Sequence, residues 1–296
     1  MADHVISHAA YGHRRRPEQI VNEPRGEAAS LRPSGLSATS APSMIWAGPQ
    51  TTGRPYQPSG EITVDEIAMP PDGSDGSSEI PPSFVGDDGV WRQVLRRHDS
   101  GHRGRALFLD RDGTIVEEIG HLRRPQDVRL VPGAASLIAA ANRVNVPVII
   151  VSNQSGIGRR LFNWGDFSAV QHRMLELLAV EHASIDAVFA CPHHPEAAEP
   201  WRHASHPARK PNPLMLQDAA RLLSVSLSKS WIVGDRASDL AAGRNAGLRG
   251  GLLLLSQTID QPGELRGAQV LAGARFRVFV TPSLVDIVRF APLLGR

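Results

Sequence analysis

The sequence predicts an α/β fold in three layers, with a parallel sheet between helices on both of its faces. After residue 90, apolar segments of strand length alternate with helical segments, which is the order typical of βαβ units. Residues 146–151 are almost continuously apolar, as expected for a strand buried on both faces. Polar residues follow three strand segments directly, at the edge where open α/β sheets bind ligands. These observations indicate a Rossmann-like domain.

The N-terminal part of the chain differs in composition from the rest. Residues 1–90 are rich in Pro, Gly, Ser and charge, and segments such as 69–78 cannot bury enough apolar area to offset chain entropy. We therefore predict a disordered extension over residues 1–90 and one folded domain over residues 91–296. A start codon assigned too early would produce the same kind of segment, so both explanations remain open.

The composition argues against several classes of protein. The formal net charge of +2 is too small to indicate nucleic-acid binding, and the basic cluster 13–16 is more simply a solvated run. The first residues do not resemble a signal peptide, and no apolar stretch is long enough to span a membrane. A single cysteine, Cys191, excludes an internal disulfide and is typical of the cytoplasm. We expect a cytoplasmic protein without a membrane or nucleic-acid partner, and a monomer is compatible with the sequence.

Local patterns predict the elements of the first half of the domain. Residues 91–97 are expected to form a short helix before the first strand, 106–109. A helix is expected over 132–144, because proline is tolerated in a first helical turn. The strand at 146–151 is followed by a helix over 166–182, with the acidic residue at 166 near its N-cap.

The second half of the domain continues the alternation. Gly247 marks the end of one of its helices, since glycine is favoured just after a helix C-terminus. The expected elements are strand 187–190, helix 213–223, strand 230–233, helix 238–246, strands 250–255 and 277–280, and a last helix over 284–290. The intervals between these elements leave no room for a large cap domain.

The most informative segment is 106–114, in which an apolar strand ends in two aspartates on alternate residues. Because residues i and i+2 of an extended chain point the same way, Asp110 and Asp112 can face one pocket. Two convergent carboxylates suit a Mg²⁺ site with a nucleophile and a neighbouring acid or base. Gly113 permits a sharp turn after them. On local grounds alone, an Asx-turn explains the same residues.

The segment Asp-x-Asp-Gly-Thr at 110–114 resembles the first motif of the haloacid dehalogenase-like (HAD-like) phosphohydrolases. Their three further motifs occur here in the same order: Ser152 after the second strand, Lys210 in an Arg-Lys-Pro segment, and Asp235 with Asp239 after a later strand. The resemblance runs from about residue 105 to the C-terminus. It implies an enzyme with an open, uncapped site, in which loops define the substrate.

The resemblance implies a role for each motif residue. Asp110 would attack phosphorus and form an aspartyl phosphate, and Asp112 would act as general acid and then as general base. Mg²⁺ would be held by Asp110, the main-chain carbonyl of Asp112, and Asp235. The remaining motif residues would position the phosphoryl group or the metal: Ser152 and Asn153 through hydrogen bonds, Lys210 through its charge, and Asp239 by bracing the site, unless it serves only as an acid favoured at a helix N-terminus.

The His-rich loop, residues 191–211, narrows the resemblance to the branch with D-glycero-heptose 1,7-bisphosphate phosphatases and histidinol-phosphatases. There the loop binds zinc through Cys-x-His and Cys-x-Cys. Cys191 and His193 match the first pair and His206 replaces the third ligand, but Ala208 cannot ligate. Two alternatives follow: a zinc site completed by His194 or His203, or a metal-free loop shaped by prolines and packing.

The resemblance also implies a phosphorylated small-molecule substrate. Segment 153–160 and the length of the His-rich loop are similar to the heptose enzymes, whereas segment 234–239 is equally similar to the histidinol enzymes. We therefore expect a heptose 1,7-bisphosphate 7-phosphatase, with a histidinol-phosphate phosphatase or a broad phosphomonoesterase as alternatives. A non-catalytic binding protein would not need the four motifs intact. The residues expected at the substrate are Glu118, His121, Asn153, Gln154, Ser155, Arg209 and Arg236.

Overall fold

The computed structural model describes residues 18–19, 84–96, 104–255 and 261–287, all within one compact unit. Most of the expected extension, including the basic cluster 13–16, therefore lies outside the described residues. Residues 84–90 lead into the fold: Val85 forms a bridge with Trp91, and Val90 is buried. No helix in the described part of the chain is long and apolar enough to cross a membrane.

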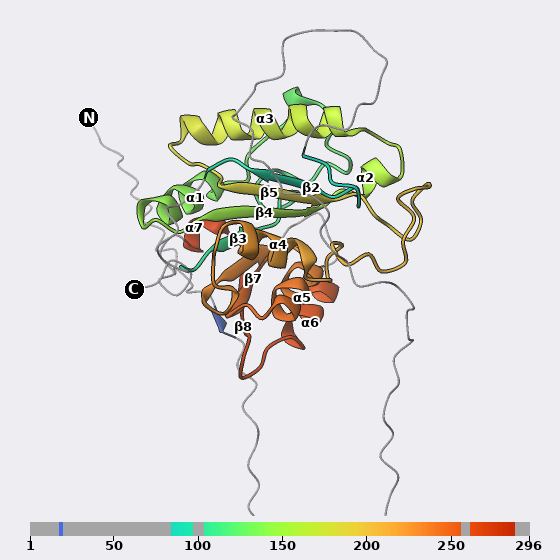
Figure 1. Ribbon diagram of the computed structural model, residues 1–296. Helices are drawn as coiled ribbons and strands as arrows, with labels where there is room; N and C mark the ends of the chain where they lie inside the picture. Colours follow the sequence, from blue (N-terminus) through green and yellow to red (C-terminus); the bar gives the residue numbers. More distant parts are fainter. Residues whose placement is uncertain (1–17, 20–83, 97–103, 256–260, 288–296) are drawn as a thin grey trace, which may run out of the picture. The chain divides into compact units, whose positions relative to one another are not determined.

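The domain is built on an eight-stranded sheet in the order β1-β8-β7-β6-β3-β4-β5-β2 (Figure 1). The pairings from β8 through to β5 are all parallel, and only the edge strands β1 and β2 run antiparallel to their neighbours. The strands are β1 (Glu18–Gln19), β2 (Trp91–Val94), β3 (Leu107–Leu109), β4 (Val148–Asn153), β5 (Ala187–Cys191), β6 (Trp231–Gly234), β7 (Gly250–Leu254) and β8 (Arg277–Thr281).

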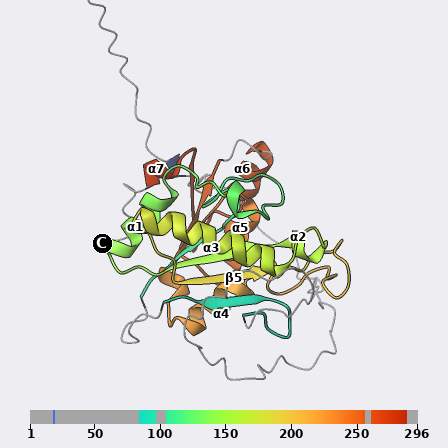
Figure 2. The same ribbon diagram turned by 90° about the horizontal axis from the view of Figure 1, so that it is seen from above.

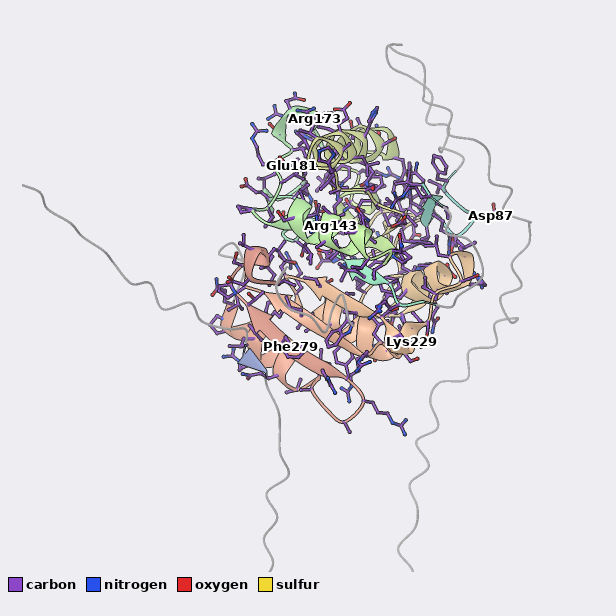
Figure 3. The ribbon with its side chains drawn as sticks, turned by 90° about the vertical axis from the view of Figure 1, so that its left-hand side faces the viewer. Asp87, Arg143, Arg173, Glu181, Lys229 and Phe279 are labelled. Atoms are coloured by element: carbon purple, nitrogen blue, oxygen red, sulfur yellow. The ribbon has the colours of Figure 1, made fainter. Side chains whose placement is uncertain are left out.

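Helices cover both faces of the sheet, which confirms the predicted three-layer arrangement (Figures 1 and 2). One face packs against α1 (Ala134–Arg143), α3 (Trp164–Val180) and α7 (Leu284–Ile287), and the other against α4 (Leu214–Leu222), α5 (Ala237–Ala246) and α6 (Gln261–Gln269). Successive strand side chains alternate between the two layers, so Leu107 and Leu109 belong to one core cluster and Phe108 to the other. The charged side chains of Arg173 on α3 and of Glu181, its C-cap residue, are exposed (Figure 3).

The predicted helix over 91–97 is wrong, because this segment forms the edge strand β2 against β5. Trp91 is buried against Trp164 and Phe167, and its neighbour in the strand, Arg92, faces the opposite layer. Pairing with the open edge of β5 and burial of a large aromatic ring outweigh the local pattern, which is too short to separate helix from strand.

Two helix boundaries and two helices also differ from expectation. Helix α3 begins at Trp164 with Asn163 as N-cap, and Asp166 is its third residue, joined to Asn163 by reciprocal hydrogen bonds of 2.9 Å. Helix α6 was not predicted, since it buries only Ala268 and has no apolar periodicity. The short α2 (Ser155–Gly158) was missed as well, and the last helix is described only to Ile287. Between β3 and α4 the described chain carries no separate cap domain, as expected.

Candidate active site

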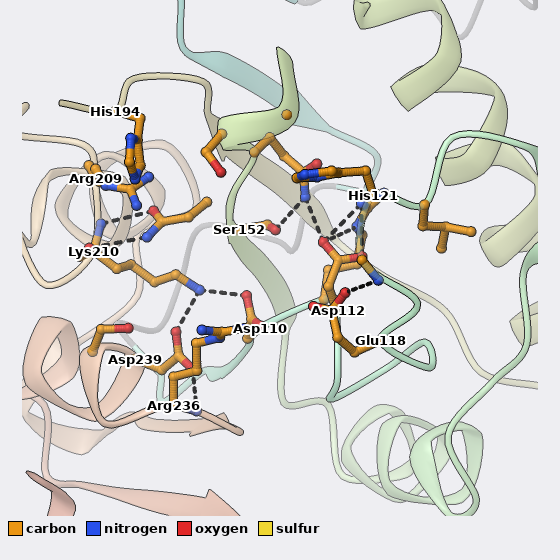
Figure 4. Close-up of a pocket in the computed structure, with 18 of the residues that line it drawn as sticks. Asp110, Asp112, Glu118, His121, Ser152, His194, Arg209, Lys210, Arg236 and Asp239 are labelled. Atoms are coloured by element: carbon orange, nitrogen blue, oxygen red, sulfur yellow. Dashed lines mark hydrogen bonds and ion pairs between the residues drawn. The ribbon is translucent and has the colours of Figure 1, made fainter. Parts of the chain in front are cut away.

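The site lies where three neighbouring parallel strands end. Leu109 of β3 is in register with Ile150 of β4 and Val233 of β6, so the residues that follow these strands emerge at one edge of the sheet. This brings together the four motif segments that are far apart in the sequence, as predicted. They line an open cavity of about 770 Å³ (Figure 4).

Lys210 lies at the middle of a cluster that we call the charged centre: Asp110, Asp235, Asp239 and Lys210. Its ammonium group is 2.5 Å from Asp110 Oδ1 and 2.7 Å from Asp239 Oδ1, and it also donates to the carbonyl of Val151 at 2.7 Å (Figure 4). Burial alone would lower the pKa of Lys210, but the two carboxylates outweigh this and raise it. The lysine is therefore a fixed cation beside the proposed nucleophile.

The three aspartates of the charged centre form a group suited to a divalent cation. Their ligand oxygens lie within 4.8 Å of one another, and both oxygens of Asp235 are buried without a hydrogen-bond partner. Burial raises the pKa of Asp110, with repulsion from Asp239 and Asp112 and against the opposing charge of Lys210. Burial, with repulsion from Asp110 and Asp239, also raises the pKa of Asp235. Carboxylate oxygens are the donors that Mg²⁺ prefers, so these residues fit the metal that the resemblance implies.

Gly113 is required for this approach of two chain segments. Its φ is +81°, and a Cβ atom there would lie 2.1 Å from Asp235 Oδ2. Any side chain would therefore push Asp235 away from Asp110, in addition to straining the turn.

Asp112 shares the cavity with Asp110, as the alternate spacing predicted, but its carboxylate is held by other groups. Gln154 Nε2 donates to it at 2.7 Å and to Ser152 Oγ at 2.8 Å. Arg111 lies 2.9 Å from the same carboxylate and is almost fully buried over the ring of Phe167. Arg111 was not among the predicted site residues; its position between the two aspartates was the only available signal.

Asn153, which is expected at the phosphoryl group, lines the cavity and also contacts Lys210. Its side-chain amide accepts from the main-chain N–H of Lys210 at 3.0 Å and donates to the Lys210 carbonyl at 3.1 Å. These reciprocal bonds tie the Asn153 side chain to the main chain of Lys210, so the amide positions that residue. Ser152, in contrast, keeps its hydroxyl at the cavity wall.

The outer part of the cavity, the rim, consists of Glu118, His121, Arg159, Arg209 and Arg236. Four of these were predicted, and Ser155 lines the cavity too; Arg159 was not assigned, although the segment that contains it was recognised. Arg209 donates to the carbonyl of His193 at 3.0 Å, and burial, with the charges of Arg159 and Arg236, lowers its pKa. Three cations at one rim favour a substrate with an anionic group away from the reaction centre.

The residues expected to bind zinc do not converge. The rings of His193 and His206 are stacked, 3.7 Å apart and 6° from parallel, so their in-plane lone pairs cannot meet at one ion. Cys191 Sγ lies 3.8 Å from His206 Nδ1, and His193 leaves Nδ1 without a partner. Among the described residues, only the three aspartates bring three ligand atoms within 4.8 Å.

Neither remaining candidate ligand completes such a site. His194 contacts Arg159 and accepts from the main chain of Glu196, and His203 accepts from Ser205. Ala208 is fully buried where the fourth ligand would stand. This arrangement of the side chains does not fit a tetrahedral zinc site.

Comparison with known proteins gives a consistent result. A family model described as HAD-hydrolase-like matches residues 207–272. D-glycero-beta-D-manno-heptose-1,7-bisphosphate 7-phosphatase from Mesorhizobium japonicum is 42% identical over 182 residues, which cover 62% of this chain and 84% of that protein. The Escherichia coli K12 protein of the same name is 33% identical over 138 residues, covering 46% of this chain and 72% of that protein.

Two crystal structures are similar to the described domain. A HAD-like phosphatase from Mesorhizobium loti has a TM-score of 0.62 and 38% identity, covering 72% of this chain and 98% of that one. The D,D-heptose 1,7-bisphosphate phosphatase from B. bronchiseptica, complexed with magnesium and phosphate, has a TM-score of 0.54 and 28% identity, with coverages of 63% and 97%.

Proposed function

This chain belongs to the HAD-like hydrolases, and we propose that it is a Mg²⁺-dependent phosphatase of a heptose 1,7-bisphosphate that removes the 7-phosphate. The observation that carries the proposal is the charged centre, in which Lys210 is fixed between Asp110 and Asp239. Beside them lies the Asp235 carboxylate, which has no hydrogen-bond partner among the described residues. The names of the relatives supply the substrate class, and the three arginines at the rim agree with a second phosphate.

In the proposed reaction, a carboxylate oxygen of Asp110 forms a bond to phosphorus while the bond from phosphorus to the sugar oxygen breaks. Asp112 gives its proton to that oxygen, then takes one from water, which attacks the aspartyl phosphate and releases inorganic phosphate. Mg²⁺ held by Asp110, the Asp112 carbonyl and Asp235 would neutralise charge that opposes the approach of two anions.

The other residues hold reacting groups in place. Lys210 stabilises the phosphoryl oxygens, and it is oriented by Asp239 and by the Asn153 amide on its main chain. Ser152 donates to a phosphoryl oxygen, while Gln154 fixes both Ser152 and the carboxylate of Asp112. Positioning of this kind supplies most of the catalysis in phosphoryl transfer.

The rim would bind the rest of the substrate. Arg209 and Arg236 offer donors to the second phosphate, and Glu118 and His121 are available to sugar hydroxyls. Ser155 contributes from the start of α2, on the same side as Arg159. The proposal includes no zinc, because the donors of the His-rich loop do not converge.

The test is release of inorganic phosphate with Mg²⁺ from both anomers of the heptose bisphosphate, histidinol phosphate and p-nitrophenyl phosphate. We expect the highest kcat/KM with one heptose anomer and product still phosphorylated at carbon 1. Chelation of Mg²⁺ should abolish turnover, and its return should restore it. A preference for histidinol phosphate would support a histidinol-phosphate phosphatase, and equal rates on all substrates would support a broad phosphomonoesterase. No turnover of any substrate by the folded protein would refute the proposed phosphatase activity.

A further inference from the structure

The His-rich loop ends in two residues that are held very differently. Lys210 is fixed at both its main chain and its ammonium group. Among the described residues, Arg209 makes one side-chain hydrogen bond, to the carbonyl of His193 in the same loop. The position of Arg209 therefore depends on how the rest of the loop is held.

The hairpin that precedes β2 contacts this loop at two points. The carbonyl of Asp88 accepts from His193 Nε2 at 2.8 Å. Gly89, with φ +72°, packs so closely under the ring of Trp201 that a Cβ atom there would lie 1.8 Å from Trp201 Cζ3. The turn of the hairpin is thus fitted to the loop, although about a hundred residues separate them in the chain.

Arg92 connects this hairpin to α4, the helix that follows the loop in the sequence. Its two terminal nitrogens donate to the two carboxylate oxygens of Asp88, both at 2.7 Å, and its Nε donates to Asp218 Oδ2 at 2.8 Å. Asp218 belongs to α4, which begins at Leu214, just after the loop. One guanidinium therefore joins the support at the start of the loop to the element that follows its end.

The three side chains are largely buried: Arg92 is 10% exposed, Asp88 19% and Asp218 3%. Removing such charges from water largely offsets their attraction, so a buried cluster adds little net stability. A planar guanidinium does fix orientation, because its N–H donors point in set directions and so hold two carboxylates in a defined position relative to each other. The cluster is suited to setting geometry.

We propose that Arg92, with Asp88 and Asp218, is a positioning clamp that holds the His-rich loop so that Arg209 meets the substrate. The hairpin does here, without a metal, what a bound ion would do for a loop of this kind. Arg92 touches neither the cavity nor the charged centre and acts through Arg209. This role rests on the proposed function, in which Arg209 binds the distal phosphate.

The test compares Arg92→Gln with Arg96→Gln. Arg96 follows the same strand and pairs with Asp186 at 3.0 Å, away from the loop, so it is a control for the loss of an ion pair at a more exposed side chain. For Arg92→Gln we expect KM for the heptose bisphosphate to rise about tenfold, since a misplaced contact weakens substrate binding. The value of kcat and the turnover of p-nitrophenyl phosphate should stay near wild type, and Arg96→Gln should change neither.

A second comparison shows whether Arg92 acts through Arg209. In an Arg209→Ala background, adding Arg92→Gln should raise KM no further, because the contact that the clamp positions is already absent. An equal rise in both backgrounds, or an unchanged KM in folded Arg92→Gln protein, would overturn the proposal. Lower thermal stability without a change in KM would likewise reduce the cluster to a structural role.

Hydrogen exchange keeps the clamp testable if the substrate proposal fails. Amides of residues 192–209 should exchange faster in Arg92→Gln than in wild type and in Arg96→Gln, under conditions where all three proteins are folded. If the wild-type protein hydrolysed no phosphate ester, the proposed phosphatase function would be refuted, but the hydrogen-exchange comparison would still test the clamp. Unchanged loop exchange in Arg92→Gln would refute the clamp and leave the function intact.

Discussion

The charged centre and the rim of the cavity are built from different parts of the fold. Asp110 and Asp235 follow strand ends, Asp239 lies in the first turn of α5, and all three are buried with Lys210. The residues of the rim come mainly from loops and are more exposed. A rigid frame fixes the atoms that react, whereas loops can change the substrate without disturbing the reaction.

Asp110→Asn should have the largest effect, since it removes the nucleophile at the charged centre. We expect kcat to fall by at least about 10⁴-fold, because an amide is a poor nucleophile of nearly the same shape. Phosphate release and the melting temperature of both proteins measure this. Near-normal activity with Mg²⁺ present would contradict a covalent mechanism, and a collapsed melting temperature would show that the loss is structural.

Asp235→Asn separates metal binding from stability. Activity should fall by at least about 10²-fold through loss of a metal ligand. Without metal, the melting temperature should rise by about 2–4 °C, because the variant removes a buried carboxylate that repels Asp110 and has no partner. Calorimetry in chelator checks the sign, and Asp112→Asn, whose carboxylate is paired in the protein, is the control. A lower melting temperature for Asp235→Asn would mean that its carboxylate stabilises the apo fold.

Arg209→Ala tests the rim. For the heptose bisphosphate we expect kcat/KM to fall by about 10–100-fold, the loss of one or two charged hydrogen bonds. p-Nitrophenyl phosphate, which has no second anion, should be hydrolysed almost as before. Arg159→Ala should have a smaller effect, because Arg159 is exposed and also pairs with Glu196 at 3.1 Å. An equal fall in kcat/KM for both substrates would mean that Arg209 acts in the phosphoryl-transfer step instead of in binding the second phosphate.

Removal of residues 1–83 also deletes the two-residue edge strand β1, but it should change kcat/KM and the melting temperature little, since the composition of this segment is unsuited to a core. Removal of residues 1–96 is the contrasting case, because it deletes β2, with buried Trp91, and two of the three clamp residues, Asp88 and Arg92. It should lower the melting temperature by at least about 6 °C. A large loss from the shorter deletion would show that β1 or another part of the extension stabilises the folded enzyme.

The smallest effect is expected from treatment with a chelator that removes any bound zinc. Treatment with a zinc-selective chelator, followed by assay in Mg²⁺, should leave activity unchanged, since the donors of the His-rich loop do not converge. Elemental analysis of the purified protein gives the metal content directly. Stoichiometric zinc that disappears in Cys191→Ser would contradict this expectation.

The charged centre could be predicted from sequence because each of its residues belongs to a short local motif. Asp110 and Asp235 directly follow buried strands, and parallel pairing of β3 with β6 then brings them together. The order of strands and helices followed from the same apolar runs. A motif does not specify which group each side chain will contact. The hydrogen bond from the Lys210 main chain to the Asn153 amide could therefore not be predicted.

The hairpin shows the opposite case. Arg92 and Asp218 are 126 residues apart, and neither lies in a motif. Whether residues 91–94 form strand or helix is decided by the free edge of β5, which no local pattern records. Likewise, Cys191, His193 and His206 have the order of a zinc loop, but ligation depends on ring orientation, which spacing does not determine.

Asp239 gives the site one more property. Its Oδ2 accepts from the main-chain N–H of Arg236 and secures the first turn of α5, while its Oδ1 holds Lys210. Gly234 leaves room for it, since a Cβ atom there would lie 2.3 Å from that same Oδ2. Helix ends ordinarily fray on their own. Here fraying would also break one of the two carboxylate contacts of Lys210, so the stability of one helical turn is linked to the position of a catalytic cation.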